Sequence, residues 1–418
     1  MKSLCFCLTL VGSFAVAQAA PIIQPNDMLA ICGDSITGQH LYSSYLEEYM
    51  LMCAPPVDGL SIAQFGRILE KASGFESHLD ADVLTFKPTI ATTMYGMNDG
   101  GYGPLTDDIA NSYRKAQTDI VEKMKANGVT RIILASPKCV GAEYHNHDVA
   151  GAAVYNKTLG ALADIDKDIA AKEGITYADV FDTFTAVLAK AQAARGPGYI
   201  VAGGDGVHPD PNGHIILAYV FLKAMGYDGA IATVTVDMDA KTAEGTPGAK
   251  VLSFDGSSVQ MECTRYPFCF TGHPTDTDGN SATILPFVPF NEELNRYMLV
   301  VKGVKGKAKV SWGGYPAQEF SGDDLAKGVN LAAAFAYDNP FHGQFFTVDH
   351  DVQVQQAYEE RLVQGFMTPR KDYTNDLPAG YAAFDKWIAD AMAIRSDLYK
   401  SAAAQVVPIH TFIKIDPE

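Results

Sequence analysis

The chain has 418 residues, more than one ordinary domain needs, and 47% of them are hydrophobic while 19% are charged. This composition supports sizeable buried cores and excludes global disorder. The formal net charge of −17 excludes binding to a phosphate backbone, which requires clustered Lys and Arg, so we predict no nucleic-acid partner.

The first residues have the pattern of a secretory signal. Lys2 precedes an apolar stretch from Leu4 to about Ala17, and small residues follow in AVAQAA. We therefore predict a signal peptide over residues 1–20 and a secreted or periplasmic protein. The apolar stretch is too short to span a bilayer comfortably and no longer one occurs, so no transmembrane segment is predicted.

The next two hundred residues alternate between strand-like and helix-like segments. Apolar runs predict strands at 28–33, 59–66, 89–96, 129–137 and 175–180, and amphipathic runs predict helices at 40–53, 108–128, 156–174 and 212–226. This alternation predicts an α/β domain over residues 21–228, with a parallel sheet covered by helices on both faces. In such domains ligands bind at the carboxyl ends of the strands.

The pattern changes after about residue 228. Short segments with glycine-bearing turns predict strands at 232–239, 250–256, 258–264, 297–304, 308–314 and 315–320. They indicate a β-rich domain over residues 229–322, built as an antiparallel sheet or a small sandwich. Helical periodicity at 322–336, 348–366 and 382–405 predicts a helical C-terminal region over residues 323–418.

Residues suited to acyl transfer follow the predicted strands. They are Ser35 in GDSIT, Gly66 in QFGR, Asn98 in YGMND, and Asp205 with His208 in GDGVHP. A serine hydroxyl needs a base to take its proton, and the base needs an acceptor that fixes its tautomer. The backbone N–H groups of Ser35 and Gly66 and the amide of Asn98 would supply donors to an oxyanion.

Each of these segments also has a purely structural interpretation. Ser35 alone fits a helix N-cap, the residues after Asn98 fit a turn, and the segment around His208 fits a loop before a helix. Their joint occurrence, in this order and at strand ends, favours a catalytic triad. The G-x-S-x-G elbow of the other common serine-hydrolase fold is absent from the chain.

The blocks Gly-Asp-Ser, a second-block glycine, Gly-x-Asn-Asp and Asp-x-x-His-Pro resemble those of the SGNH, or GDSL-type, hydrolase superfamily. This resemblance covers residues 25–226 and implies a flavodoxin-like three-layer α/β/α sandwich. It implies catalytic roles for Ser35, Asp205 and His208 and an oxyanion hole of Ser35, Gly66 and Asn98. Gly74 is an alternative to Gly66. The segment LAKGVNLA resembles C-terminal extensions of some secreted bacterial members.

The resemblance implies a secreted serine esterase, a carboxylic ester hydrolase that works through an acyl-enzyme. We predict as substrate a small acyl group on a carbohydrate, in a small-molecule or polysaccharide ester. The alternatives are a lysophospholipase or thioesterase of the same superfamily and a catalytically silent carbohydrate-binding protein. We predict no cofactor and no metal, and no feature of the sequence indicates an oligomeric state.

Several cysteines and histidines lie outside the predicted triad. Cys263 and Cys269 flank a five-residue segment and either close a disulfide loop or remain separate thiols, because spacing alone does not determine their geometry. His145, His147 and Asp148 follow the fourth predicted strand. They favour the lining of a pocket or a plain loop over a metal site, for which no further ligand is evident. His214 is expected to be structural.

Overall fold

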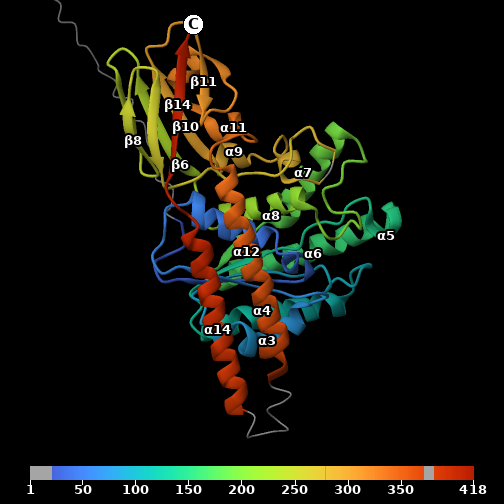
Figure 1. Cartoon of the computed structure of the whole chain (residues 1–418). Helices are drawn as coiled ribbons and strands as arrows, with labels where there is room; N and C mark the ends of the chain where they lie inside the picture. Colours follow the sequence, from blue (N-terminus) through green and yellow to red (C-terminus); the bar gives the residue numbers. More distant parts are fainter. Residues whose placement is uncertain (1–20, 278, 371–380) are drawn as a thin grey trace, which may run out of the picture.

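The computed structural model describes residues 21–277, 279–370 and 381–418, so the predicted signal peptide at 1–20 lies outside the described residues. An α/β unit lies below two small β-sheets, and two long C-terminal helices run from the sheets down along the α/β unit (Figure 1). None of the helices in the described part of the chain combines the length and apolar character needed to cross a membrane.

The α/β unit is organised around one parallel sheet. Its strands are β1 (Met28–Gly33), β2 (Ser61–Gly66), β3 (Ile90–Met94), β4 (Arg131–Ala135) and β5 (Thr176–Ala178). They lie in the order β2-β1-β3-β4-β5 and all pair in parallel. The strands read as nearly continuous apolar runs because a sheet covered on both faces buries both sets of side chains. The five predicted strands are confirmed.

Helices cover both faces of this sheet. They are α1 (Ser35–Gly38), α2 (Tyr42–Glu48) with its π-helical continuation η1 (Tyr49–Cys53), α3 (Ala72–Asp82), η2 (Leu84–Phe86), α4 (Asp107–Ala126), α5 (Tyr144–His147), α6 (Val149–Glu173), α7 (Val180–Arg195) and α8 (Pro211–Ala224). Leu29 and Ile31 belong to one buried core and Ala30 and Cys32 to the other, since successive strand side chains point to opposite faces. The predicted three-layer α/β/α architecture is confirmed, and α3 and α7 add to the predicted helices.

The β-rich region consists of two sheets, the number that the sandwich alternative predicts. Its strands are β6 (Ala230–Asp237), β7 (Thr242–Gly245), β8 (Ala249–Phe254), β9 (Ser258–Cys263), β10 (Arg296–Lys302), β11 (Lys307–Trp312), β12 (Gln318–Ser321), β13 (Val329–Asn330) and β14 (Ile409–Pro417). The sheets have the orders β13-β10-β6-β7 and β12-β11-β14-β9-β8. The first is mixed, because β6 and β10 pair in parallel, which differs from the antiparallel arrangement expected. Trp312, fully buried, contacts Tyr297 of the first sheet at 4.8 Å between ring centroids.

The helices within and after this region are η3 (Ser281–Ile284), α9 (Phe290–Glu293), α10 (Gly322–Lys327), α11 (Leu331–Ala334), α12 (His342–Leu362), η4 (Val363–Met367) and α14 (Tyr381–Ala404). Helices α12 and α14 lie side by side (Figure 1). After α14 the chain returns to the β-rich region as β14, which lies in the middle of the second sheet and was not predicted. The predicted helical C-terminal region is therefore tied to the β-sheets.

Helix α12 covers the edge of the parallel sheet. The backbone N–H of Gln64 in β2 donates to Glu359 Oε2 at 3.0 Å, and Gln355 Nε2 donates to the carbonyl of Ile62 at 3.4 Å. An uncovered edge strand exposes unpaired backbone groups, and these long polar side chains bind them instead. The edge of the parallel sheet is thus completed by residues almost three hundred positions away.

The cysteines of the described residues are all buried free thiols. Cys263 Sγ lies 3.1 Å from the hydroxyl of Tyr297, whereas Cys269 contacts Asn339. The two thiols that the sequence left open as a disulfide pair therefore pack against different partners in this structure.

Candidate active site

Ser35 lies at the carboxyl end of β1, where it begins α1. The cap of this helix is Asp34, whose Oδ1 accepts from the N–H of Ile36 at 2.9 Å. The Ser35 hydroxyl is therefore not used as a cap, and its Oγ lies 2.8 Å from His208 Nε2. The competing structural role predicted for Ser35 belongs to its neighbour.

His208 and Asp205 lie in the loop before α8. His208 Nδ1 lies 2.6 Å from Asp205 Oδ2, and Asp205 Oδ1 accepts from the N–H groups of Val207 and His208, both at 2.8 Å. Burial opposes ionisation, but these hydrogen bonds outweigh it and hold the pKa of Asp205 below its usual value. A carboxylate on Nδ1 selects the tautomer whose bare Nε2 faces Ser35.

The turn that brings these two groups together requires a glycine. Gly203 has φ of +89°, and a Cβ added there would lie 1.6 Å from the carbonyl oxygen of His208. Any side chain at this position would displace the histidine. The loop geometry, and not only the residue types, therefore sets the distance between His208 and Ser35.

Two buried polar residues support the loops around Ser35. Burial raises the pKa of Asp34 to about 7. Burial lowers the pKa of His214 to about 3, so its ring is neutral at physiological pH. His214 Nδ1 accepts from the N–H of Tyr42, and Nε2 lies 3.1 Å from Gln39 Oε1. His214 is structural, as expected from the sequence.

Gly66 lies beside the Ser35 helix, but its N–H is already used. It donates to Gln64 Oε1 at 2.7 Å, so an oxyanion would have to compete with this side chain for the N–H, and the predicted oxyanion role of Gly66 stays a prediction. The glycine is required for another reason, since a Cβ added to Gly66 would lie 2.2 Å from the backbone nitrogen of Gly38. Its alternative, Gly74, lies in α3 against the carboxylate of Glu70.

The amide of Asn98 is oriented by two hydrogen bonds. Its Nδ2 donates to the carbonyl of Glu70 at 3.0 Å, and its Oδ1 accepts from the hydroxyl of Tyr102 at 2.7 Å. An amide nitrogen carries two hydrogens, and the bond to Glu70 uses one of them. Sequence reasoning did not find Glu70, because a backbone carbonyl leaves no signal in the residue type.

A cavity of about 400 Å³ adjoins His208 and Asp205. Its lining is mostly polar or aromatic: Tyr102, Glu143, Tyr144, His145, Asn146, His147, Gly204, Asp205, Val207 and His208. His145, Asn146 and His147 all have positive φ, a strained conformation for residues with a Cβ and one that clusters at functional sites. The two histidines line this pocket, as the sequence suggested.

No group of three or more His, Cys, Asp or Glu side chains suited to a metal ion occurs among residues 21–277, 279–370 and 381–418.

At the carboxyl ends of the parallel strands, Ser35, His208 and Asp205 form a hydrogen-bonded series of the kind that serine hydrolases use. Residues 31–216 match the model of the GDSL-like lipase/acylhydrolase family. The predicted superfamily and the predicted enzyme class, a hydrolase of carboxylic esters, are both confirmed. A search of curated proteins gave no match.

Several solved structures are similar to the chain. BT4096, described as a gut microbial diltiazem-metabolizing enzyme, is 21% identical with a TM-score of 0.76, covering 96% of this chain and 100% of its own. Its similarity shows that the α/β, β-rich and helical parts form a recurring fold. Axe2, an acetylxylan esterase from Geobacillus stearothermophilus, is 21% identical with a TM-score of 0.40, covering 49% of this chain and 96% of its own.

Proposed function

We propose that this chain is a secreted serine esterase with Ser35 as nucleophile and His208 and Asp205 as its activating pair. His208 Nε2 takes the hydroxyl proton while Ser35 Oγ attacks the ester carbonyl, and then gives that proton to the leaving alcohol. A water, deprotonated by the same nitrogen, releases the acyl group as a carboxylic acid. The Ser35–His208–Asp205 hydrogen-bond series supports this proposal most directly.

The oxyanion that forms in each step requires donors. We assign this role to the N–H of Ser35 and the second Nδ2 hydrogen of Asn98, whose amide is already held by Glu70 and Tyr102. Such preorganised donors need no reorientation when charge develops on the carbonyl oxygen.

The substrate we propose is a small acyl group on a carbohydrate. The cavity beside His208 supports this choice, because nearly all of its lining side chains carry hydrogen-bonding groups and Val207 is its aliphatic member. Export is proposed from the signal-like pattern of residues 1–20.

The acyl preference follows from the same cavity. Hydrolysis of p-nitrophenyl acetate is expected to exceed that of the decanoate by about 10-fold or more in kcat/KM, because a polar lining does not repay burial of a long chain. Spectrophotometric assays of an acyl-length series measure this ratio. A preference for decanoate would favour the lysophospholipase or thioesterase alternative, with the exposed Ile68 and Leu69 as an apolar acyl surface.

A fluorophosphonate probe distinguishes the enzyme from a silent carbohydrate-binding protein. Stoichiometric labelling at Ser35, located by peptide mass spectrometry, is expected because the probe needs a serine activated by a histidine. Pre-incubation with an ester substrate should slow the labelling. Folded protein that takes up no probe would exclude the assembled triad and leave the binding function.

A further inference from the structure

The loop between β2 and α3 holds the amide of Asn98. Within it, Glu70 supplies the carbonyl that accepts from Asn98 Nδ2. Its neighbour Leu69 has φ of +59° and is exposed, so this leucine adopts the left-handed conformation without packing to repay the strain. The shape of the loop must therefore be imposed by contacts made elsewhere.

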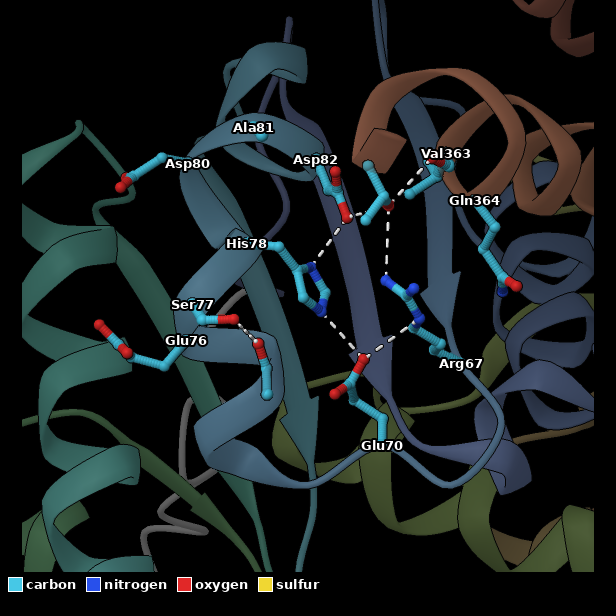
Figure 2. A network of polar contacts seen from close by, with 12 residues as sticks. Arg67, Glu70, Glu76, Ser77, His78, Asp80, Ala81, Asp82, Val363 and Gln364 are labelled. Carbon is cyan, nitrogen blue, oxygen red and sulfur yellow. Dashed lines mark hydrogen bonds and ion pairs between the residues drawn. The ribbon is translucent and has the colours of Figure 1, made fainter. Parts of the chain in front are cut away.

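These contacts converge on the imidazole of His78 in α3. Its Nε2 lies 2.9 Å from Glu70 Oε2, and its Nδ1 lies 2.8 Å from Asp82 Oδ2 (Figure 2). Arg67 Nε approaches the same Glu70 oxygen at 3.5 Å. The His78 side chain is only 11% exposed. Its Nε2 hydrogen-bonds Glu70, and its contact with Asp82 is an ion pair, which requires the imidazolium form.

The C-terminal region contacts the other side of this cluster of His78, Glu70, Asp82 and Arg67. The hydroxyl of Thr368, just after η4, donates to Asp82 Oδ2 at 2.8 Å and accepts from Arg67 Nη1 at 3.4 Å. Gln364 Nε2 donates to the carbonyl of Gly66 at 3.3 Å. The segment that follows α12 thus contacts the loop where it leaves β2, at Gly66 and Arg67, and contacts the C-terminal end of α3, at Asp82.

We propose that Glu70 and His78 are positioning residues, which act through the loop to hold the amide of Asn98 toward the reacting carbonyl. The imidazolium fixes the Glu70 carboxylate, the carboxylate fixes the loop, and the Glu70 carbonyl fixes the Asn98 amide. Thr368 binds both Asp82 and Arg67, and it thereby connects the C-terminal helices to the candidate active site. The catalytic meaning of this proposal rests on the proposed esterase function.

The restraint of the loop by His78 depends on pH. The charged groups around His78 are Glu70 and Arg67 of the loop, Asp82 of α3, and Glu360 of α12, which lines the same small cavity. Burial alone would lower the pKa of His78, but hydrogen bonds to Asp82 and Glu70 outweigh it and raise the pKa from 6.5 to about 8. His78 is therefore charged below about pH 6.5, and its ion pairs with Glu70 and Asp82 then restrain the loop. This restraint is lost as the pH rises through 8 and His78 loses its proton.

Nuclear magnetic resonance tests the coupling without relying on activity. In the full-length protein with ¹⁵N-labelled asparagine, the side-chain amide pair absent from Asn98→Ala is assigned to Asn98. We expect this pair to titrate with the His78 imidazole, with a midpoint near pH 8. In His78→Gln it should be displaced and should no longer titrate, whereas Glu76→Gln, on the same helix but paired with Lys123, should leave it unchanged. If the chemical shifts of this amide pair did not change while His78 titrates in the wild-type protein, the proposal would be overturned.

Kinetics then separate a positioning role from general stabilisation. His78→Gln is expected to lower kcat for p-nitrophenyl acetate by about 10-fold with little change in KM, and to remove the alkaline limb near pH 8. In the Asn98→Ala background the same substitution should cost less than about 2-fold, because its effect passes through that amide. Equal costs in both backgrounds would overturn the positioning role. Coupled resonances in a protein without esterase activity would instead refute the proposed function and leave the His78–Asn98 coupling intact.

Discussion

Replacing Ser35 by alanine is expected to lower kcat/KM for p-nitrophenyl acetate by at least about 10⁴-fold. The substitution removes the one atom that forms the acyl-enzyme, and His208 then has no hydroxyl to activate. Oxyanion donors and substrate binding remain, so a small residual rate above the uncatalysed reaction is expected. Steady-state assays at saturating and limiting substrate measure both kcat and kcat/KM.

The same variant should remain folded, which separates chemistry from stability. Ser35 is only partly buried, and the cap of α1 is provided by Asp34, so Tm should change by less than about 2 °C. Ser112→Ala, at an exposed position on α4, is the matched control and should keep full activity. A substitution outside the catalytic groups can lower kcat/KM by roughly 10-fold. If kcat/KM of Ser35→Ala were within about 10-fold of the wild-type value, Ser35 would not be the nucleophile.

The parallel sheet and the meeting of Ser35 with His208 could be predicted because both depend on local rules. Alternation of apolar strands with amphipathic helices specifies a parallel sheet, and a parallel sheet gathers its loops at one edge. Ser35 and His208 are 173 residues apart, yet each directly follows or precedes an element with a clear pattern. The topology therefore brings their segments to one edge of the sheet, and the loop at Gly203 sets the distance between the two side chains.

The donors around the site could not be predicted in the same way. The N–H of Gly66 donates to a side chain two residues away, and no residue pattern distinguishes this from a free N–H. Glu70 acts through its carbonyl, which every residue possesses. Motif reasoning identifies residues that need a particular side chain, and it cannot find backbone groups whose availability depends on their neighbours.

The placement of the C-terminal elements could not be predicted from the sequence either. The strand pattern of 230–237 and 296–302 is visible in the sequence, but their parallel pairing depends on the path of the intervening chain. The polar residues of α12 give that helix a weak apolar face, although Gln355 and Glu359 are fully buried. Their burial is explained only by the edge of β2, which they cover.

A buried ion pair joins the two long C-terminal helices to this edge. Arg395 Nε of α14 donates to Glu359 Oε1 of α12 at 2.7 Å, and Arg395 Nη1 donates to Ser61 Oγ of β2 at 2.7 Å. Glu359 and the nearby Glu47 are both fully buried, and burial raises the pKa of both carboxyls, to about 8 for Glu47. Arg395 opposes both shifts, so it is the cation that keeps this acidic cluster compatible with burial.

Arg395→Met is therefore expected to destabilise the protein by about 3 to 5 kcal/mol at pH 7, because it leaves a buried carboxylate without its partner. Guanidinium chloride unfolding, followed by the tryptophan fluorescence of the chain, measures the loss. Without Arg395, Glu359 should retain a proton in the folded state that it releases on unfolding. Burial already raises the pKa of Glu359 in the wild-type protein, so the deficit should grow once the pH exceeds that raised value, by up to about 1.4 kcal/mol per pH unit.

The matched control is Lys386→Met, which breaks an exposed ion pair with Asp390 on the same helix. An exposed pair of this kind contributes at most about 1 kcal/mol, so the control should unfold close to wild type and show no added pH dependence. Because α12 covers the edge of β2, limited proteolysis of Arg395→Met should cut first between α12 and α14 while the parallel sheet remains protected. A variant as stable as Lys386→Met at pH 7 would mean that the Glu359–Arg395 pair does not hold the helices on the sheet, and that the apolar contacts of α12 suffice.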